Sequence, residues 1–550
     1  MCDVAEHLVE TSLSIYSCTT SVGPSSNHEL YRRMSVHAIV PAELPTRSLR
    51  RPFAVRMWTR LLRVWSRASV SRLGRYSVER VEALDKYCEQ VSLLRVILVC
   101  VLTPVPSLLV ELASEIIPLR DPADGWKVNS GAWIRLFIII TSTAAGSLFQ
   151  VRSTTPELSY FKVFSIAFAT GLGSTPALML LASLWGYPLP FTILLMTIPA
   201  AIIFVPLVLL TIIRKGGKLI GTMKLKICLI LAQAQITFLY VAFSVVFENS
   251  SNALRFGLIL FLPLMKLFLK NVVARLASDN VESIPAVAVF TLDVFNALYS
   301  AICMQASGSW WTSLVMIVVN VVQTTLSISE INGAAVSFLA LNHNKTAISQ
   351  PKRSRVMEAS PRKARERSPS LLQSARLKMY TAPSLHHINR QKPSPEVTIS
   401  ATQMEISSQL LFHLEYRVLV GYIEAFIPLL YAIHLSILSH LPSAEYYPPT
   451  RIPSNDQLRS TVGGILAYAS TEVASLVWLH LEIKRKLGFS MLYQLAFVLE
   501  TETELLQGRL FVWIVILLQL TLAHYGTFVC FKASEELAYP IVLVWFSVTS

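Results

Sequence analysis

Long apolar runs dominate the sequence. A bilayer core about 30 Å thick needs roughly 20 apolar residues in a helix. The runs are continuous and do not alternate with period two, so they predict helices rather than barrel strands. We therefore predict an all-α, polytopic integral membrane helix bundle with about eleven spans, at 93–117, 131–151, 163–186, 190–213, 227–247, 254–270, 284–305, 309–329, 418–441, 461–482 and 509–530.

A polar stretch divides these spans into groups of eight and three. Residues 341–405 are rich in Lys, Arg, Ser and Pro, which predicts a disordered basic linker. The other predicted regions are a disordered tail (1–46), a basic amphipathic segment (47–90), an eight-helix region (91–332), a three-helix region (408–530) with an inner-face helix at 489–507, and a C-terminal tail (531–550).

The composition excludes most soluble enzymes. Hydrophobic residues make up 53% of the 550 residues and charged ones 15%, against about 25% charged in soluble domains. The net charge of +14 is concentrated in two basic segments, which indicates membrane topology rather than nucleic-acid binding. The seven cysteines show no paired spacing and no nucleotide or protease motif occurs, so we predict no enzyme, cofactor or metal site.

The basic residues of the loops predict the orientation, because Lys and Arg collect on the cytoplasmic side. With a cytoplasmic N-terminus, the inner loops hold thirteen basic residues, Lys266 and Lys270 among them, and the outer loops hold five. The N-terminus and the 341–405 linker are therefore predicted to be cytoplasmic. Asn249, in an outer-loop Asn-Ser-Ser sequon, is a candidate glycosylation site.

Both basic segments are predicted to contact anionic lipids of the inner leaflet. A basic helical face backed by tryptophans is typical of a helix among lipid headgroups, and a solvated face packed on the inner loops is the alternative. In the first basic segment (47–90), the residues predicted to contact lipid headgroups are Arg56, Arg60, Arg63 and Arg67. In the linker, Ser360, Ser368 and Ser394 precede prolines and are candidate phosphorylation sites, although an unregulated spacer explains the same composition.

Ionisable residues inside spans are costly and indicate function. Glu111 and Arg135 have similar predicted depths, which favours a structural ion pair. Asp293 lies in mid-span with Asn296 one turn on, while Glu424 and Glu472 lie inside later spans. These three carboxylates have no basic partner at similar depth on their own helices, so a structural role and a cation or proton path are both open.

Glycine and proline positions raise the prospect of broken helices. The third span contains Gly171, Gly173 and Pro176, and the fourth contains Pro199. Broken helices expose backbone groups that bind ions in transporters. The same residues also allow close packing of unbroken helices.

Several stretches resemble a large group of uncharacterised multi-pass membrane proteins of oomycetes. The resemblance covers roughly residues 50–530 and implies the membrane architecture without an activity. It is carried by LLRV at 93–96, IPLR at 117–120 with GW at 125–126, FTLD at 290–293 with FNALY at 295–299, LPSA at 441–444 with YYP at 446–448, and LYQLAFVLE at 492–500.

Two functions remain open from the sequence. The first is a secondary transporter or channel-like protein that uses Asp293, Glu424 and Glu472 to move a cation or proton, with a small ion or solute as partner. The second is a non-catalytic membrane scaffold or receptor-like organiser that acts through its basic segments.

Overall fold

The computed structural model describes most of the membrane region of the chain. The described ranges are 74–153, 158–189, 191–213, 220–248, 252–277, 281–307, 310–348, 395–447 and 455–519, with single residues between and beside them. Six candidate site residues lie outside the described residues: Arg56, Arg67, Asn249, Ser360, Ser368 and Ser394.

The described ranges form helices and contain no strand. In chain order they are α4 (Val78–Gln90), α5 (Leu93–Leu102), α6 (Val105–Glu115), η2 (Pro122–Asp124), α7 (Ser130–Arg152), α8 (Tyr160–Trp185), α9 (Thr192–Leu195), α10 (Thr197–Ile213), α11 (Ile220–Glu248), α12 (Asn252–Leu276), η4 (Val281–Ser283), α13 (Ile284–Ser307), α14 (Trp310–Ile348), α16 (Pro395–Leu438), η6 (Pro442–Tyr446), α17 (Asn455–Leu487), α18 (Met491–Thr501) and α19 (Thr503–Gln519).

Seven helical stretches of the described chain are long and apolar enough to cross a membrane. They are Leu93–Glu115, Ser130–Arg152, Tyr160–Trp185, Thr192–Thr211, Val281–Ala301, Glu405–Leu438 and Leu458–Leu487. Each overlaps one of the predicted spans. The other four predicted spans overlap α11, α12, α14 and α19, which are helical but are not among the seven. The count of about eleven spans and the cytoplasmic placement of the N-terminus stay predictions.

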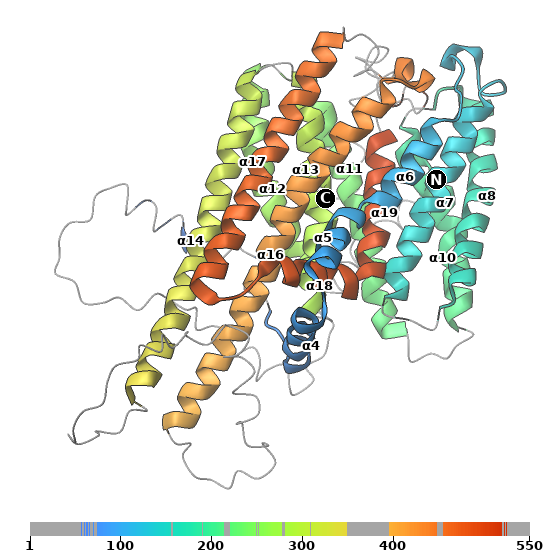
Figure 1. Cartoon of the computed structure of the whole chain (residues 1–550). Helices are drawn as coiled ribbons and strands as arrows, with labels where there is room; N and C mark the ends of the chain where they lie inside the picture. The colour runs from blue at the N-terminus through green and yellow to red at the C-terminus, as the bar shows by residue number, and fades with distance from the viewer. Residues whose placement is uncertain are drawn as a thin grey trace, which may run out of the picture.

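The long helices run side by side, and α13 and α16 lie at the centre (Figure 1). The apolar windows of Val281–Ala301 and Glu405–Leu438 are both 83% buried, whereas that of Thr192–Thr211 is 17% buried. Large apolar side chains on the outer helices, such as Leu94 and Phe161, are exposed. A helix bundle that exposes apolar residues outward and buries its centre is suited to lipid.

Three predicted boundaries differ from the structure. Helices α14 and α16 extend into both margins of the predicted 341–405 linker, and they project past the other helices at one end (Figure 1). The predicted inner-face helix at 489–507 is two helices, α18 and α19, which meet at Glu502. Thr501 and Thr503 lie on either side of that corner, and their hydroxyls donate to the α18 carbonyls of Phe497 and Leu499 at 2.8 and 2.9 Å.

The basic amphipathic segment is described only in part. Met57, Arg60, Leu62, Arg63 and Trp65 have helical backbone conformation. Both arginines are exposed, while the leucine and the tryptophan are partly buried. The predicted basic face stays a prediction, because Arg56, Trp58, Leu61 and Arg67 lie outside the described residues.

Two glycines bring α7 and α19 into close contact. A Cβ added at Gly146 would lie 2.6 Å from the carbonyl oxygen of Gly508, and a Cβ at Gly508 would overlap the carbonyl oxygen of Gly146. Small residues let membrane helices approach closely and gain dispersion contacts. The last helix of the described chain is therefore packed directly against the second span.

Gly508→Ala should lower the free energy of unfolding by roughly 1–3 kcal/mol, because backbone atoms must move to admit the methyl group. Thermal unfolding of the purified protein measures the effect. Gly464→Ala is the matched control, since a Cβ there meets nothing within 4 Å. Equal effects of the two substitutions would contradict the close-contact interpretation.

Candidate functional site: a buried charge network

The centre of the network is Asp293, which is fully buried on α13. Lys266 Nζ lies 2.7 Å from Asp293 Oδ1, and Lys270 Nζ lies 2.7 Å from Asp293 Oδ2. The two lysines are four residues apart on α12, so they point from the same helical face. Both oxygens of the carboxylate are thus held by cations.

The α16 helix adds an acid and a base to this pair of ion pairs. Glu424 Oε1 lies 3.2 Å from Lys266 Nζ, and Glu424 Oε2 lies 3.8 Å from Arg417 Nη1. The hydroxyl of Tyr416 accepts a hydrogen bond from Lys270 at 2.9 Å. Seven residues separate Arg417 from Glu424, which places them on one face of the helix.

Glu472 of α17 lies at the edge of the network. The side-chain amide of Asn320, on α14, donates to Glu472 Oε1 at 2.6 Å and to the Tyr468 hydroxyl at 3.1 Å. Arg417 donates to the Thr324 hydroxyl, one turn along α14, at 2.9 Å. Within the described chain no cation lies within ion-pair distance of Glu472, so this carboxylate is held by a neutral amide.

The network is balanced in charge when all its members are ionised. Its cations are Lys266, Lys270 and Arg417, and its carboxylates are Asp293, Glu424 and Glu472. It joins α12, α13, α14, α16 and α17. A buried charge in a medium of low polarity is stabilised when it meets an opposite charge, and α12 supplies such partners to Asp293 of α13 and Glu424 of α16.

The structure brings together three of the four transport-path candidates. Asp293, Glu424 and Glu472 belong to the network. Asn296 is partly buried and takes part in none of the network contacts described above. Sequence analysis missed Lys266 and Lys270, which it counted as inner-loop residues. Their spacing of four residues inside an apolar run was the signal for a shared face directed into the bundle.

Arg135 does not pair with Glu111 as predicted; it forms an ion pair with Glu115. Arg135 Nη1 lies 2.8 Å from Glu115 Oε2, and its other amino group donates to the carbonyls of Glu115 and Ile117 at 3.0 and 2.6 Å. Glu115 lies one turn beyond Glu111, beside the carbonyls at the end of α6 that have no partner within the helix. The Arg135 guanidinium therefore contacts both the Glu115 carboxylate and these carbonyls. Glu111 instead accepts from the Gln519 amide at 3.1 Å.

Tyr447 completes the arrangement around Glu115. Its hydroxyl, just past η6, donates to Glu115 Oε1 at 2.5 Å. Burial and then the Glu115 carboxylate raise the pKa of Tyr447 well above its ordinary value, so the phenol stays protonated and keeps donating.

The opposite end of the bundle is held by three glutamates around the corner between α18 and α19. Glu500 pairs with Arg95 of α5 at 2.9 Å, and Glu502 lies 3.6 Å from Arg80 of α4. Glu504 pairs with Arg152 of α7. Alternate residues of one acidic corner therefore hold three separate N-terminal helices.

The third span is not broken at the candidate residues. Helix α8 runs unbroken through Gly171, Gly173 and Pro176. A Cβ at Gly171 would overlap the Thr141 hydroxyl of α7, and one at Gly173 would lie 2.6 Å from the Ile203 side chain of α10. The glycines serve close packing, which was the alternative interpretation.

Pro199 lies in the first turn of α10, directly after the short helix α9. The first turn of a helix tolerates the missing N–H of proline, because the N–H there has no partner within the helix. The fourth span is therefore divided just before Pro199, at Met196.

The first span is also broken, at Thr103 and Pro104 between α5 and α6. Proline has no N–H, so Pro104 cannot donate to the Cys100 carbonyl. That carbonyl accepts from the Tyr422 hydroxyl at 2.8 Å, and the Thr103 carbonyl accepts from the Gln507 amide at 2.7 Å. Two neighbouring helices thus satisfy the backbone at the break.

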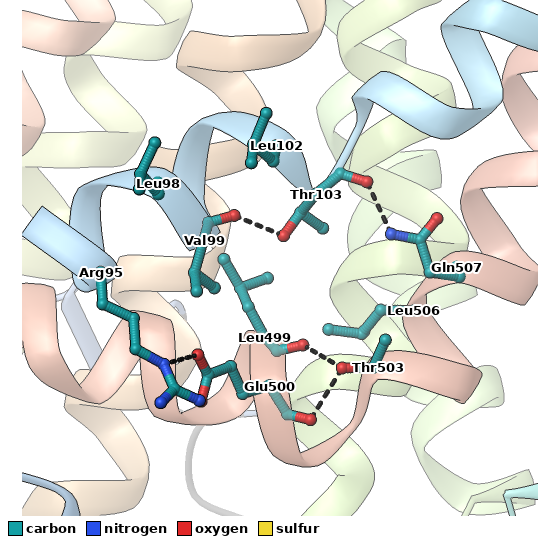
Figure 2. Close-up of a pocket in the computed structure, with 10 residues that line it drawn as sticks. All are labelled: Arg95, Leu98, Val99, Leu102, Thr103, Leu499, Glu500, Thr503, Leu506 and Gln507. Carbon is teal, nitrogen blue, oxygen red and sulfur yellow. Dashed lines mark hydrogen bonds and ion pairs between the residues drawn. The ribbon is translucent and has the colours of Figure 1, made fainter. Parts of the chain in front are cut away.

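A pocket of about 290 Å³ lies beside this break, between α5, α18 and α19 (Figure 2). The Arg95–Glu500 ion pair stands at one end and the Thr103–Gln507 hydrogen bond at the other. Its walls are mainly apolar, and the lining residues are Arg95, Leu98, Val99, Leu102, Thr103, Leu499, Glu500, Thr503, Leu506 and Gln507.

Asp293→Asn should lower the free energy of unfolding by about 3–5 kcal/mol, because it leaves two buried lysines facing a neutral amide. Glu472→Gln keeps an oxygen that accepts from Asn320, so its cost should stay below about 1 kcal/mol. Thermal unfolding of both purified variants checks this difference. A similar loss in both would mean that Glu472 has a charge partner in the folded protein.

No protein-family model, curated protein or solved structure matches this chain. The resemblance to the oomycete membrane proteins is not tested by these comparisons and stays a prediction.

Proposed function

We propose that this multi-pass membrane protein is a secondary transporter that couples the movement of a solute to a proton, with Glu472 as the proton-carrying side chain. The observation that carries the proposal is the network of six ionisable residues between the helices. Three of the seven helical stretches compatible with membrane crossing, those that contain α13, α16 and α17, contribute residues to it. The proposal deepens the transporter hypothesis drawn from the sequence.

The cost of the network supports a role beyond stability. Each charge taken out of water costs several kcal/mol, and well-packed apolar residues would hold the helices together as well or better. Ionisable residues inside membrane bundles typically mark ion or proton paths. Six such residues on adjoining helices are therefore easier to explain by transport than by folding alone.

The geometry favours a proton over a metal cation. Both oxygens of Asp293 are held by lysines at 2.7 Å, and Glu424 lies between Lys266 and Arg417. These acids have little free coordination for a metal ion. Glu472, held by an amide, can gain a proton without leaving a cation unpaired, and loss of its charge would leave the network with a net positive charge.

Glu472 lies close enough to the ion pairs to influence them. Asn320 and Thr324 are one turn apart on α14, and they contact Glu472 and Arg417 respectively. Protonation of Glu472 would remove a negative charge near Arg417. Arg417 would then be attracted more strongly to Glu424. Gain or loss of the Glu472 proton would thus shift α17 relative to α14 and α16. Transport requires this type of coupling.

Wild-type protein in liposomes that contain a pH-sensitive dye should change the luminal pH when gradients of amino acids, sugars or organic acids are imposed. Glu472→Gln should abolish this solute-driven proton movement, because its amide cannot carry the proton. Glu482→Gln is the matched control: it lies on the same helix and pairs with Lys486, outside the network. Proton movement that persists in Glu472→Gln would overturn the assignment of Glu472.

The scaffold hypothesis has one observation in its favour, since α14 and α16 project beyond the bundle at the ends of the basic linker (Figure 1). Replacement of 349–394 with a short Gly/Ser linker keeps both helices and separates the two hypotheses. Transport should survive this replacement if the network is the working part. Folded wild-type protein that moves no proton with any solute pool would instead favour the scaffold.

A further inference from the structure

Arg509 is a buried cation of α19 without a carboxylate partner. Its side chain is 0% exposed, two turns from the start of the helix. One amino group donates to the Thr291 hydroxyl of α13. Its Nε and Nη2 atoms have no hydrogen-bond partner among the described residues.

Every other buried cation of the described chain has an acid beside it. Arg80 lies 3.1 Å from Glu415, and Arg135 lies 2.8 Å from Glu115. Lys266, Lys270 and Arg417 belong to the central network described above. The contrast matters because an isolated charge in a bundle interior is much more costly than a paired one.

Thr291 cannot compensate this charge. Its hydroxyl donates to the Val287 carbonyl, with 2.5 Å between the two oxygens. Only the neutral hydroxyl oxygen therefore faces the guanidinium. One neutral acceptor leaves the positive charge and two nitrogen donors of Arg509 unsatisfied.

A second residue with an unsatisfied donor lies on the same face of α19. Trp513, one turn after Arg509, is also 0% exposed, and its indole Nε1 has no hydrogen-bond partner among the described residues. Its ring meets Phe295 of α13 edge-on at a centroid distance of 5.2 Å. Thr291 and Phe295 are likewise one turn apart, so both pairs lie along the α13–α19 interface.

We infer that the α13–α19 interface binds a small monovalent inorganic anion of the halide class at Arg509 and Trp513. A single guanidinium neutralises one negative charge, and guanidinium and indole N–H groups are the donors that such an anion accepts. A divalent anion would leave an uncompensated charge in the bundle. The inference goes beyond the proposed function, because anion binding is independent of whether Glu472 carries a proton.

The test is an equilibrium titration of the purified full-length protein. Thermal unfolding is followed while sodium chloride or bromide replaces sodium gluconate at constant ionic strength. A ligand that binds only the folded state raises the unfolding temperature, and the increase saturates with its concentration. We expect a saturable increase of a few degrees with both halides and none with sulfate.

Three variants assign the effect to the site. Arg509→Met should unfold at a higher temperature than wild type in gluconate, because an unpaired buried charge is gone, and should lose the halide-dependent increase. Trp513→Phe should weaken the halide affinity several-fold by removing one N–H. Arg95→Met removes the same charge from an exposed position on α5 and should retain the full increase.

The outcomes that overturn the inference are equally specific. A wild-type titration without a saturable halide effect would do so, as would an unchanged effect in Arg509→Met. If Arg509→Met does not fold, Arg509→Lys serves instead: it keeps the charge with a different donor geometry, and the site requires it to bind halide with altered affinity. Binding unchanged in both Arg509→Lys and Trp513→Phe would exclude this site.

Discussion

The buried ion pairs of Asp293 with Lys266 and Lys270 are the interaction on which the arrangement of the central helices depends. In a bilayer core no water stabilises an isolated charge, so each one must meet an opposite charge across a helix interface. Two lysines from one face of α12 close on both oxygens of one carboxylate of α13. This contact allows little freedom in the rotation or the register of the two helices, and α16 joins them through Glu424.

The same constraint separates buried charges that have an oppositely charged partner from those that do not. Where an acid and a base match, as for Arg135 with Glu115 or Arg95 with Glu500, the pair ties one helix to another. Where they do not match, the charge needs a different explanation. Glu472 faces an amide and Arg509 faces a hydroxyl, and these are the two positions at which we propose a transported proton and a bound anion.

The sequence predicted the helices better than the contacts. Seven of its apolar runs coincide with helices fit to cross a membrane, because the length and polarity of a span are local properties that the bilayer dictates. The acids Asp293, Glu424 and Glu472 could be selected by depth alone. Lys266 and Lys270 were assigned to a loop because the positive-inside rule counts charge without direction, and Arg135 was given an acid one turn away from its true partner.

The sequence by itself determined that this chain is helical, is rich in apolar spans and carries ionisable residues inside those spans. These properties follow from composition and spacing. Only the tertiary structure decided which charges meet. Partners such as Lys266 and Glu424, or Arg95 and Glu500, are separated by 158 and 405 residues of sequence. Their meeting depends on how each helix is rotated about its axis and on how closely the helices approach, as α7 and α19 do at Gly146 and Gly508. No local pattern encodes it.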